Sequence, residues 1–167
     1  MGLRPVFRVS PNSMKWKRCN GNLRWEILEG HFSITFTHTF NNFKDSDTAY
    51  FAWTYPYSFE ESLKKTQKLL KKFSNHPDIY IHREVLYYSR EHRPMELITF
   101  SGREKITEEK EDLMDGLFPE AHGDQETRPY KFDKPTIFLS SRVHPGETPA
   151  SFVLNGIWSF LTNEKSV

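Results

Sequence analysis

The hydrophobic pattern is clearest at residues 31–40, where apolar and polar side chains alternate. Successive side chains of a β-strand point to opposite faces, so the alternation predicts a strand with one buried and one exposed face. We expect residues 48–53 to be its partner across a turn, which would form a β-hairpin. His38 falls on the apolar side of the alternation. We expect it to be a hydrogen-bonded histidine in the core or at the sheet edge.

A helical pattern follows at residues 58–73, where apolar residues recur at the spacing of one helix face. Five lysines and two glutamates give this stretch a local charge of +3. The pattern predicts an amphipathic helix with a basic polar face. That face suits an acidic partner, but a solvated surface with cations near the helix C-terminus accounts for it without any partner.

Two strands are predicted next, at residues 79–89 and 95–100, where β-branched and aromatic residues are frequent. His82 and Glu84 lie two residues apart and therefore on one face of the first strand. That spacing is compatible with a salt bridge or a metal contact. No further residue supports a metal at this place, so we expect a structural role for both.

A strongly acidic segment separates these strands from the last part of the chain. Residues 103–126 hold nine acidic and three basic residues, a local charge of −6. Residues 107–117 can form a short amphipathic helix. We expect the remainder, as far as residue 129, to be an exposed insertion between strands.

The region from residue 137 to residue 161 has the pattern of a strand, an irregular turn and a helix. The apolar run 137–139 predicts a buried strand. Thr148 offers a hydroxyl N-cap and Pro149 suits the first helical position, so a helix is expected to begin here and to carry the apolar residues up to Leu161. The intervening residues 140–147 lie where irregular backbone lets side chains converge on a ligand.

His144 and Glu147 are the candidate metal ligands of this turn. Imidazole nitrogen and carboxylate oxygen both suit zinc, and the Pro-Gly pair between them can turn the chain so that both side chains face one point. The spacing also fits an ordinary surface turn with an incidental ion pair. Arg142 in the same turn suits a substrate carboxylate, with a local salt bridge as the simpler interpretation.

Composition narrows the remaining possibilities. A chain of 167 residues suits one domain, or one domain beside part of another, and a net charge of +1 gives no overall attraction to nucleic acids or membranes. Cys19 is the single cysteine, so an internal disulfide is impossible and a reducing compartment is expected. No apolar run approaches the roughly 20 residues that cross a bilayer. We expect a cytoplasmic protein with no nucleic-acid or membrane partner; a nucleic-acid-binding β domain, suggested by basic residues around Trp16, is the weakest alternative.

The residues around the predicted zinc ligands resemble the first zinc-binding segment of the cytosolic carboxypeptidases, which are zinc carboxypeptidases. The resemblance covers residues 142–149 and continues through Ser151-Phe152-Val153 and Asn155-Gly156. Further segments resemble the same family in the same order, namely Tyr55-Pro56-Tyr57-Ser58, His82-Arg83-Glu84-Val85-Leu86, Leu97-Ile98-Thr99 and Leu117-Phe118-Pro119. Together they are most similar to the branch of the family that removes branch-point glutamates.

The resemblance implies an α/β fold, or an α+β fragment of one, that is incomplete at both ends. Residues 1–56 correspond to the C-terminal part of an antiparallel β domain. Residues 57–167 correspond to the N-terminal part of a metallocarboxypeptidase catalytic domain, with its first strands and helices. Zinc is the implied cofactor, and His144 and Glu147 are the first two of its three protein ligands.

The resemblance also implies a function, the proteolytic removal of C-terminal or branch-point glutamates from proteins such as tubulin with polyglutamate side chains. In the family the third ligand is a histidine well downstream, and the substrate-binding arginine and the catalytic glutamate follow it. We therefore assign no catalytic residue here and expect the general base beyond Val167. The alternative is a truncated, inactive protein that serves as a tubulin-interaction module.

Overall fold

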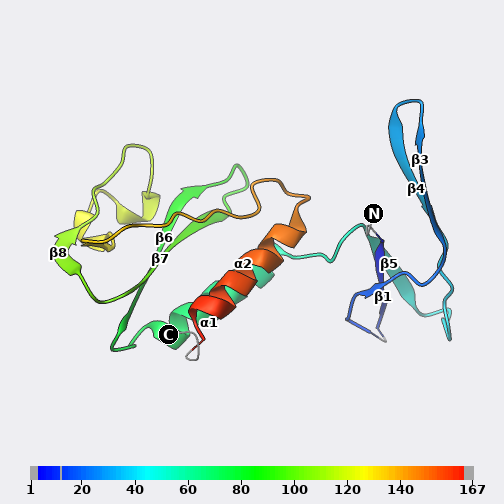
Figure 1. Ribbon diagram of the computed structural model, residues 1–167, viewed down its shortest axis with the longest axis horizontal. Helices are drawn as coiled ribbons and strands as arrows, with labels where there is room; N and C mark the ends of the chain where they lie inside the picture. Colours follow the sequence, from blue (N-terminus) through cyan, green and yellow to red (C-terminus); the bar gives the residue numbers. More distant parts are fainter. Residues whose placement is uncertain (1–3, 12, 164–167) are drawn as a thin grey trace. The chain divides into compact units, whose positions relative to one another are not determined.

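The computed structural model describes residues 4–11 and 13–163. Within them the chain has an α+β fold, in which several small antiparallel sheets are combined with two α-helices (Figure 1). The chain divides into two compact units: residues up to Ser58 with those from Ser140 onward, and Phe59–Leu139. The domain boundary expected at residue 56 stays a prediction. Neither described helix is long and apolar enough to cross a membrane.

The first unit begins with two separate antiparallel sheets. One has three strands in the order β2-β1-β5, formed by Lys17–Arg18, Val6–Ser10 and Thr48–Ala52. The other is a hairpin of β3 (Leu23–Leu28) and β4 (His31–Phe36). The strand predicted from the alternating pattern is therefore confirmed, although it ends earlier than the pattern does.

The partner of β4 differs from the expected one. β4 pairs with β3, and β5 pairs with β1, so the predicted hairpin between residues 31–40 and 48–53 is wrong. The reason is local, because Glu29 and Gly30 both have positive φ, 49° and 80°. This is the backbone conformation that a two-residue hairpin turn needs. Such a short loop also loses less chain entropy on closure than the longer connection from β4 to β5.

His38 lies beyond the end of β4, in a cluster of aromatic rings. Its ring centroid is 3.8 Å from that of Phe7, 4.6 Å from that of Phe40 and 5.9 Å from that of Phe51. Both ring nitrogens are buried without a hydrogen-bond partner in the described part of the chain. The expected hydrogen bond is therefore wrong, because the apolar side of the alternation surrounds the imidazole with phenylalanines. This burial lowers the pKa of His38 from its ordinary value.

We predict that the first unit loses stability as the pH falls through about 6.5, the ordinary histidine pKa. Below that pH the unfolded chain binds a proton that native His38 resists, so acid favours unfolding. His38→Phe should flatten the pH dependence of the unfolding free energy, measured by urea denaturation with tryptophan fluorescence. His31→Gln is the matched control because His31 is exposed on β4; an equal flattening in that variant would contradict the assignment.

The second unit begins with the predicted helix and the two predicted strands, which the structure pairs as a β-hairpin. These are α1 (Phe59–Phe73), β6 (Ile79–Tyr88) and β7 (Pro94–Gly102), and the two strands pair antiparallel. Phe73 is buried at the end of the helix, and its ring meets that of Phe100 edge-on at 5.4 Å between centroids. This contact fixes the C-terminal end of α1 to the sheet.

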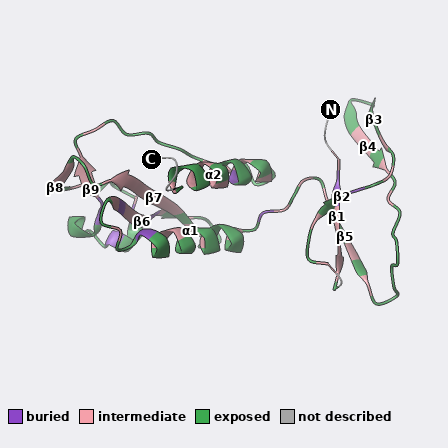
Figure 2. Cartoon of the chain, turned by 60° about the horizontal axis from the view of Figure 1, so that its bottom comes forward, coloured by how far each residue is buried: buried purple, intermediate pink, exposed green. Residues whose placement is uncertain are grey.

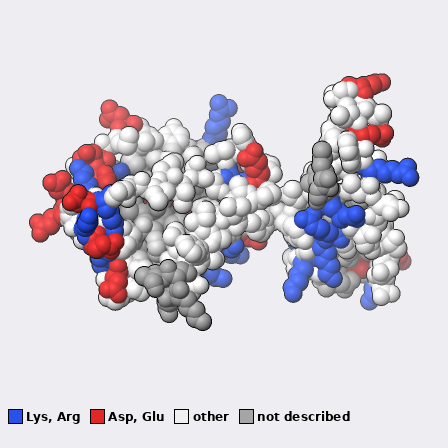
Figure 3. Space-filling view, in the orientation of Figure 1, with Lys and Arg blue, Asp and Glu red and all other residues white. Residues whose placement is uncertain are grey.

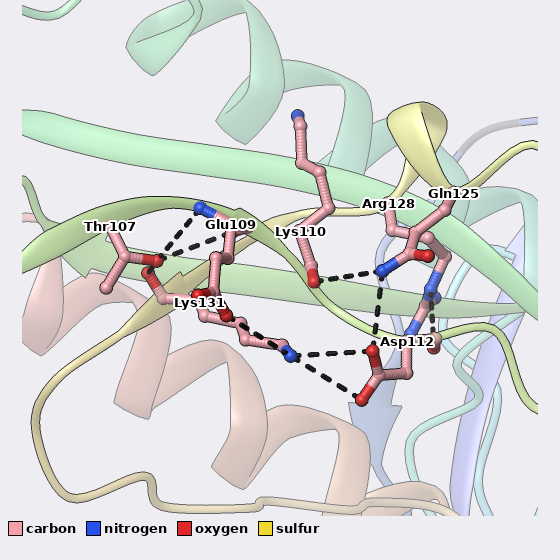
Figure 4. A network of polar contacts seen from close by, with 7 residues as sticks. All are labelled: Thr107, Glu109, Lys110, Asp112, Gln125, Arg128 and Lys131. Atoms are coloured by element: carbon pink, nitrogen blue, oxygen red, sulfur yellow. Dashed lines mark hydrogen bonds and ion pairs between the residues drawn. The ribbon is translucent and has the colours of Figure 1, made fainter.

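The acidic segment folds as a strand where a helix is expected. Ile106–Lys110 form β8, which pairs antiparallel with β9 (Tyr130–Phe132), so the predicted helix at 107–117 is wrong. β-branched side chains at the start of the segment favour extended backbone. The Thr107 hydroxyl also donates to the Lys131 carbonyl at 3.1 Å, and Figure 4 shows these two residues facing each other. Pairing with β9, which is distant in sequence, therefore decides the local structure.

Oppositely charged side chains offset the acidic charge near β8. The Lys131 ammonium lies 3.4 Å from a carboxylate oxygen of Asp112 and 3.7 Å from one of Glu109 (Figure 4). Lys134 contacts Glu104 at 2.6 Å in the same way. Figure 3 shows acidic and basic side chains interspersed around this strand. The expected net charge is thus present but partly neutralised.

The segment after residue 117 is anchored to the sheet at a few buried positions. The Phe118 N–H donates to the Leu86 carbonyl of β6 at 3.0 Å, and Phe118 and Ala121 are both buried. Two short 3₁₀ helices, η1 (Pro119–Ala121) and η2 (Gln125–Thr127), follow. The buried residues of this unit lie mainly on β6 and in this segment, and they are purple in Figure 2. The expectation of an exposed insertion between strands therefore holds for residues 122–127, which are exposed, and is wrong for the buried residues Phe118, Ala121 and Arg128.

A buried ion pair ties this segment to the sheet. The Arg128 guanidinium donates to a carboxylate oxygen of Glu84, and the two side chains are only 6% and 8% exposed. Arg128 also lies over the Phe118 ring, 3.3 Å from its centroid. The second carboxylate oxygen of Glu84 is buried without a partner among the described residues. Burial raises the pKa of the Glu84 carboxyl, and the neighbouring arginine opposes that shift. The structural role expected for Glu84 is consistent with this pairing.

Replacing Glu84 by Gln should destabilise the second unit by about 3–5 kcal/mol, because Arg128 would keep a buried charge without a counterion. Glu84→Leu combined with Arg128→Met should recover most of that loss, since a well-packed apolar pair is often as stable as a buried ion pair. Urea unfolding followed by circular dichroism measures both effects.

The matched control for this experiment is Glu109→Gln. Glu109 also contacts a cation, Lys131, but its side chain is 78% exposed. Water therefore screens the pair and replaces it easily. A loss of stability in Glu84→Gln no larger than that of the control would contradict the importance of the buried pair.

The apolar run 137–139 is not a buried strand. Ile137, Phe138 and Leu139 are 82%, 74% and 52% exposed, and they pair with no other strand in the described ranges. Apolar residues indicate a strand only where a neighbouring strand can accept their backbone hydrogen bonds. No described strand pairs with this run. The predicted strand is therefore wrong.

Candidate metal centre

The second helix, α2 (Thr148–Leu161), begins directly after the turn that holds the predicted zinc ligands. Its extent confirms the predicted helix, with Pro149 in the first turn. The N-cap residue is Glu147 rather than Thr148, and no side chain caps the helix. The Thr148 hydroxyl is engaged elsewhere, because it donates to the Tyr55 carbonyl at 2.9 Å and lies 2.6 Å from the Thr54 hydroxyl.

The segment 54–57 therefore positions the start of α2. Tyr57 is buried, its hydroxyl donates to Asn155 at 3.3 Å, and its ring meets that of Phe152 edge-on at 5.2 Å. These contacts join residues almost a hundred positions apart in the chain. Sequence periodicity gave no signal for them; only the resemblance at Tyr55-Pro56-Tyr57 marked the segment as notable.

Arg142 holds the turn in place through backbone carbonyls. Its Nε and Nη2 donate to the Pro145 carbonyl at 2.9 and 2.6 Å, and its Nη1 donates to the Tyr57 carbonyl at 3.1 Å. Nη1 also lies 3.4 Å from the Ser151 hydroxyl. No acidic side chain of the described chain forms an ion pair with Arg142. The expected local salt bridge is therefore wrong, since carbonyl oxygens take its place.

His144 and Glu147 point toward one another across the turn. The His144 Nδ1 and a Glu147 carboxylate oxygen are 2.9 Å apart, and the side chains are 73% and 55% exposed. The Glu147 N–H donates to the His144 carbonyl at 3.1 Å, which closes the turn through Pro145 and Gly146. The two predicted ligands are thus brought together by the local backbone.

This arrangement fits two ligands of one zinc ion. Ligands of tetrahedral zinc that each lie about 2.0–2.2 Å from the ion are about 3.3–3.5 Å apart. The observed separation of 2.9 Å needs to widen by only a few tenths of an ångström. High exposure leaves space for a hydrated ion beside the pair. The chemistry of the donors, one imidazole nitrogen and one carboxylate oxygen, also suits zinc.

The pair is not a complete zinc site in the described residues. Catalytic zinc sites usually have three protein ligands. No group of three or more histidine, cysteine, aspartate or glutamate side chains suited to hold a metal occurs within residues 4–11 and 13–163. The role of His144 and Glu147 as metal ligands therefore stays a prediction that the local geometry favours.

Sequence comparison places these observations in a family. No protein-family model matches the chain. Curated proteins do match it over nearly its whole length, and by these matches the chain is a homologue of the cytosolic carboxypeptidases.

Two of these relatives are cytosolic carboxypeptidase-like protein 5 from human and from zebrafish (Danio rerio). The human protein is 36% identical over 169 residues, which cover 96% of this chain and 19% of the relative. The zebrafish protein is 34% identical over 175 residues, which cover 98% and 19% respectively. Mouse cytosolic carboxypeptidase 6 is 28% identical over 160 residues, 96% of this chain and 23% of the relative. The chain thus spans about a fifth of the length of these relatives, and the resemblance seen in the sequence is confirmed.

Replacing Arg142 by Ala should loosen the turn that carries the predicted ligands. Hydrogen bonds from a charged group typically contribute about 1.5–3 kcal/mol each, and the backbone carbonyls would lose theirs. Amide hydrogen exchange should become faster at Glu147 and Ala150, whose N–H groups donate to the His144 and Glu147 carbonyls. Arg90→Ala is the control, because Arg90 is exposed in the other unit. Unchanged amide exchange rates in the Arg142 variant would show that the turn is stable without the hydrogen bonds of Arg142.

Proposed function

We propose that this chain is part of a zinc metallocarboxypeptidase, in which His144 and Glu147 are two of the protein ligands of zinc. The observation that supports the proposal most directly is the convergence of these two side chains at 2.9 Å, in a chain homologous to cytosolic carboxypeptidases. The turn before α2 directs the His144 nitrogen and the Glu147 carboxylate oxygen toward the same point. Arg142 and Thr148 flank the pair in sequence and act as positioning residues, because Arg142 binds the Pro145 carbonyl and Thr148 binds the Tyr55 carbonyl.

Zinc bound at this place would polarise the scissile carbonyl and activate a water molecule. The residues of this chain have a simpler task, which is to present a neutral imidazole nitrogen and an ionised carboxylate oxygen. The hydrogen bond between His144 and Glu147 would be exchanged for two metal bonds.

We further propose that the substrate is a protein that carries glutamates at its C-terminus or at branch points, with tubulin as the leading candidate, and that the protein works in the cytoplasm. The relatives are named carboxypeptidases, which supports cleavage at a C-terminal residue. The basic surface of α1, with five lysines against two glutamates, supports an acidic substrate. The general base and the third ligand would be supplied outside the residues of this chain.

A second candidate function is a non-catalytic interaction module for tubulin or another acidic protein. It is favoured by the fact that only two convergent ligands occur in the described residues. The two candidates differ in a simple assay. Under the first proposal the chain binds zinc through His144, and under the second it binds no zinc at that residue.

The chain should bind zinc weakly, because two ligands leave the ion largely hydrated, and His144→Ala should abolish that binding. Glu147→Gln should weaken it strongly, since a neutral amide is a poorer ligand than a carboxylate. Competition with a chromogenic zinc chelator measures both changes, and adding excess chelator to the unmodified protein should remove the ion completely.

The control for this experiment is His92→Ala, because His92 is an exposed histidine in the other unit. This variant should bind zinc as the unmodified chain does. If His144→Ala and His92→Ala reduce zinc binding equally, the ion binds histidines indiscriminately and the proposed pair is wrong.

A further inference from the structure

Helix α1 presents a row of lysines on one face. Lys64, Lys68 and Lys71 are all exposed. Their spacing of four and three residues places them one above another along the helix. The ends of the row are about 10 Å apart, given a rise of about 1.5 Å per residue. The row therefore forms a linear basic surface rather than a scattered charge.

These three ammonium groups have no counterion in the described part of the protein. No acidic side chain there lies within 4.0 Å of them. Lysines elsewhere in the same unit behave differently, because Lys131 and Lys134 each contact a carboxylate. The three ammonium groups of the α1 row are thus not paired with a carboxylate among the described residues.

The opposite face of α1 is occupied by the fold. Phe73 is buried against β7. No large apolar side chain of α1 is among the exposed ones. The helix therefore has no free apolar face for insertion into a bilayer, which an interfacial helix requires. The lysine row also contains no aromatic ring, which binding of single-stranded nucleic acid normally uses for base stacking.

We propose that Lys64, Lys68 and Lys71 form a docking surface for an extended, glutamate-rich peptide. Side chains on alternate residues of an extended chain are about 6.6–6.8 Å apart. Lys64 and Lys68 are separated by about 6 Å along the helix axis, and Lys68 and Lys71 by about 4.5 Å. Carboxylates on every second residue can therefore meet Lys64 and Lys68, and the long side chain of Lys71 can extend to the next carboxylate. The choice of a glutamate-rich peptide rests on the proposed function, and the docking itself needs no metal.

The test measures binding of fluorescein-labelled peptides to the full chain by fluorescence anisotropy, with a zinc chelator present. The variant Lys64→Gln/Lys68→Gln/Lys71→Gln should bind an oligoglutamate about tenfold more weakly, the combined effect of three exposed ion pairs of ordinary strength. Glutamine keeps the helix propensity of lysine, and circular dichroism verifies that the variant is folded. The matched control is Lys15→Gln/Lys17→Gln/Lys44→Gln, which removes three exposed lysines from the other unit.

Peptide affinity should also depend on the spacing of the glutamates in the peptide and on the salt concentration. A peptide with glutamates on alternate residues should bind more tightly than one with the same number of glutamates in a single block. Raising the salt concentration from about 0.01 M to about 0.1 M shortens the Debye length from about 30 Å to about 10 Å. This change should weaken binding to the unmodified chain more than binding to the α1 variant.

Three results would overturn the proposal. They are equal losses in the α1 variant and the control, no preference for alternate spacing, or tighter α1-dependent binding of single-stranded DNA or of phosphatidylserine vesicles than of the peptide. Failure of the proposed function would look different. In that case zinc binding would not depend on His144, while peptide binding, measured with chelator present, would be unchanged.

Discussion

The turn before α2 depends on the Arg142 guanidinium. One side chain satisfies the carbonyls of Pro145 and Tyr57, and it thereby fixes both the turn and the segment that precedes α1. Arginine suits this position because its planar group holds several donors in a rigid arrangement. His144 and Glu147 are exposed and make few contacts of their own. Their mutual orientation therefore depends on backbone that Arg142 holds, and so does any metal chemistry at this place.

In the second unit, a buried ion pair with a large desolvation cost lies inside a small core. Glu84 and Arg128 are almost fully buried, and desolvation penalises both charges. Their pairing nevertheless joins β6 to the residues before β9, because neither charge can be left without the other. A core built from only a few buried apolar side chains, such as Val85 and Phe118, gains a specific connection from this pair. The segment that was expected to be exposed is ordered for this reason.

Charged side chains have two different roles in the second unit. Near β8, lysines and acidic residues neutralise one another at contacts of 2.6–3.7 Å, which serves the fold. Along α1, the lysine row has no such partners among the described residues and remains available to a ligand. The lysine row offers the proposed acidic peptide a surface of opposite charge, and homology to carboxypeptidases supports the proposed cleavage at a C-terminal residue.

The sequence by itself determined the features that depend on neighbours in the chain. Helix α1, helix α2 and the strands β6 and β7 follow from local sequence patterns, and the approach of His144 to Glu147 follows from the Pro-Gly turn between them. Pairing of β4 with β3, the strand β8 in place of a helix and the exposed course of residues 137–139 depend on which distant strand is available, which periodicity does not encode. The same holds for the role of Arg142, whose partner Tyr57 lies 85 residues away. Only the tertiary structure brings such groups together, because a hydrogen bond or a sheet pairing is decided by proximity in space.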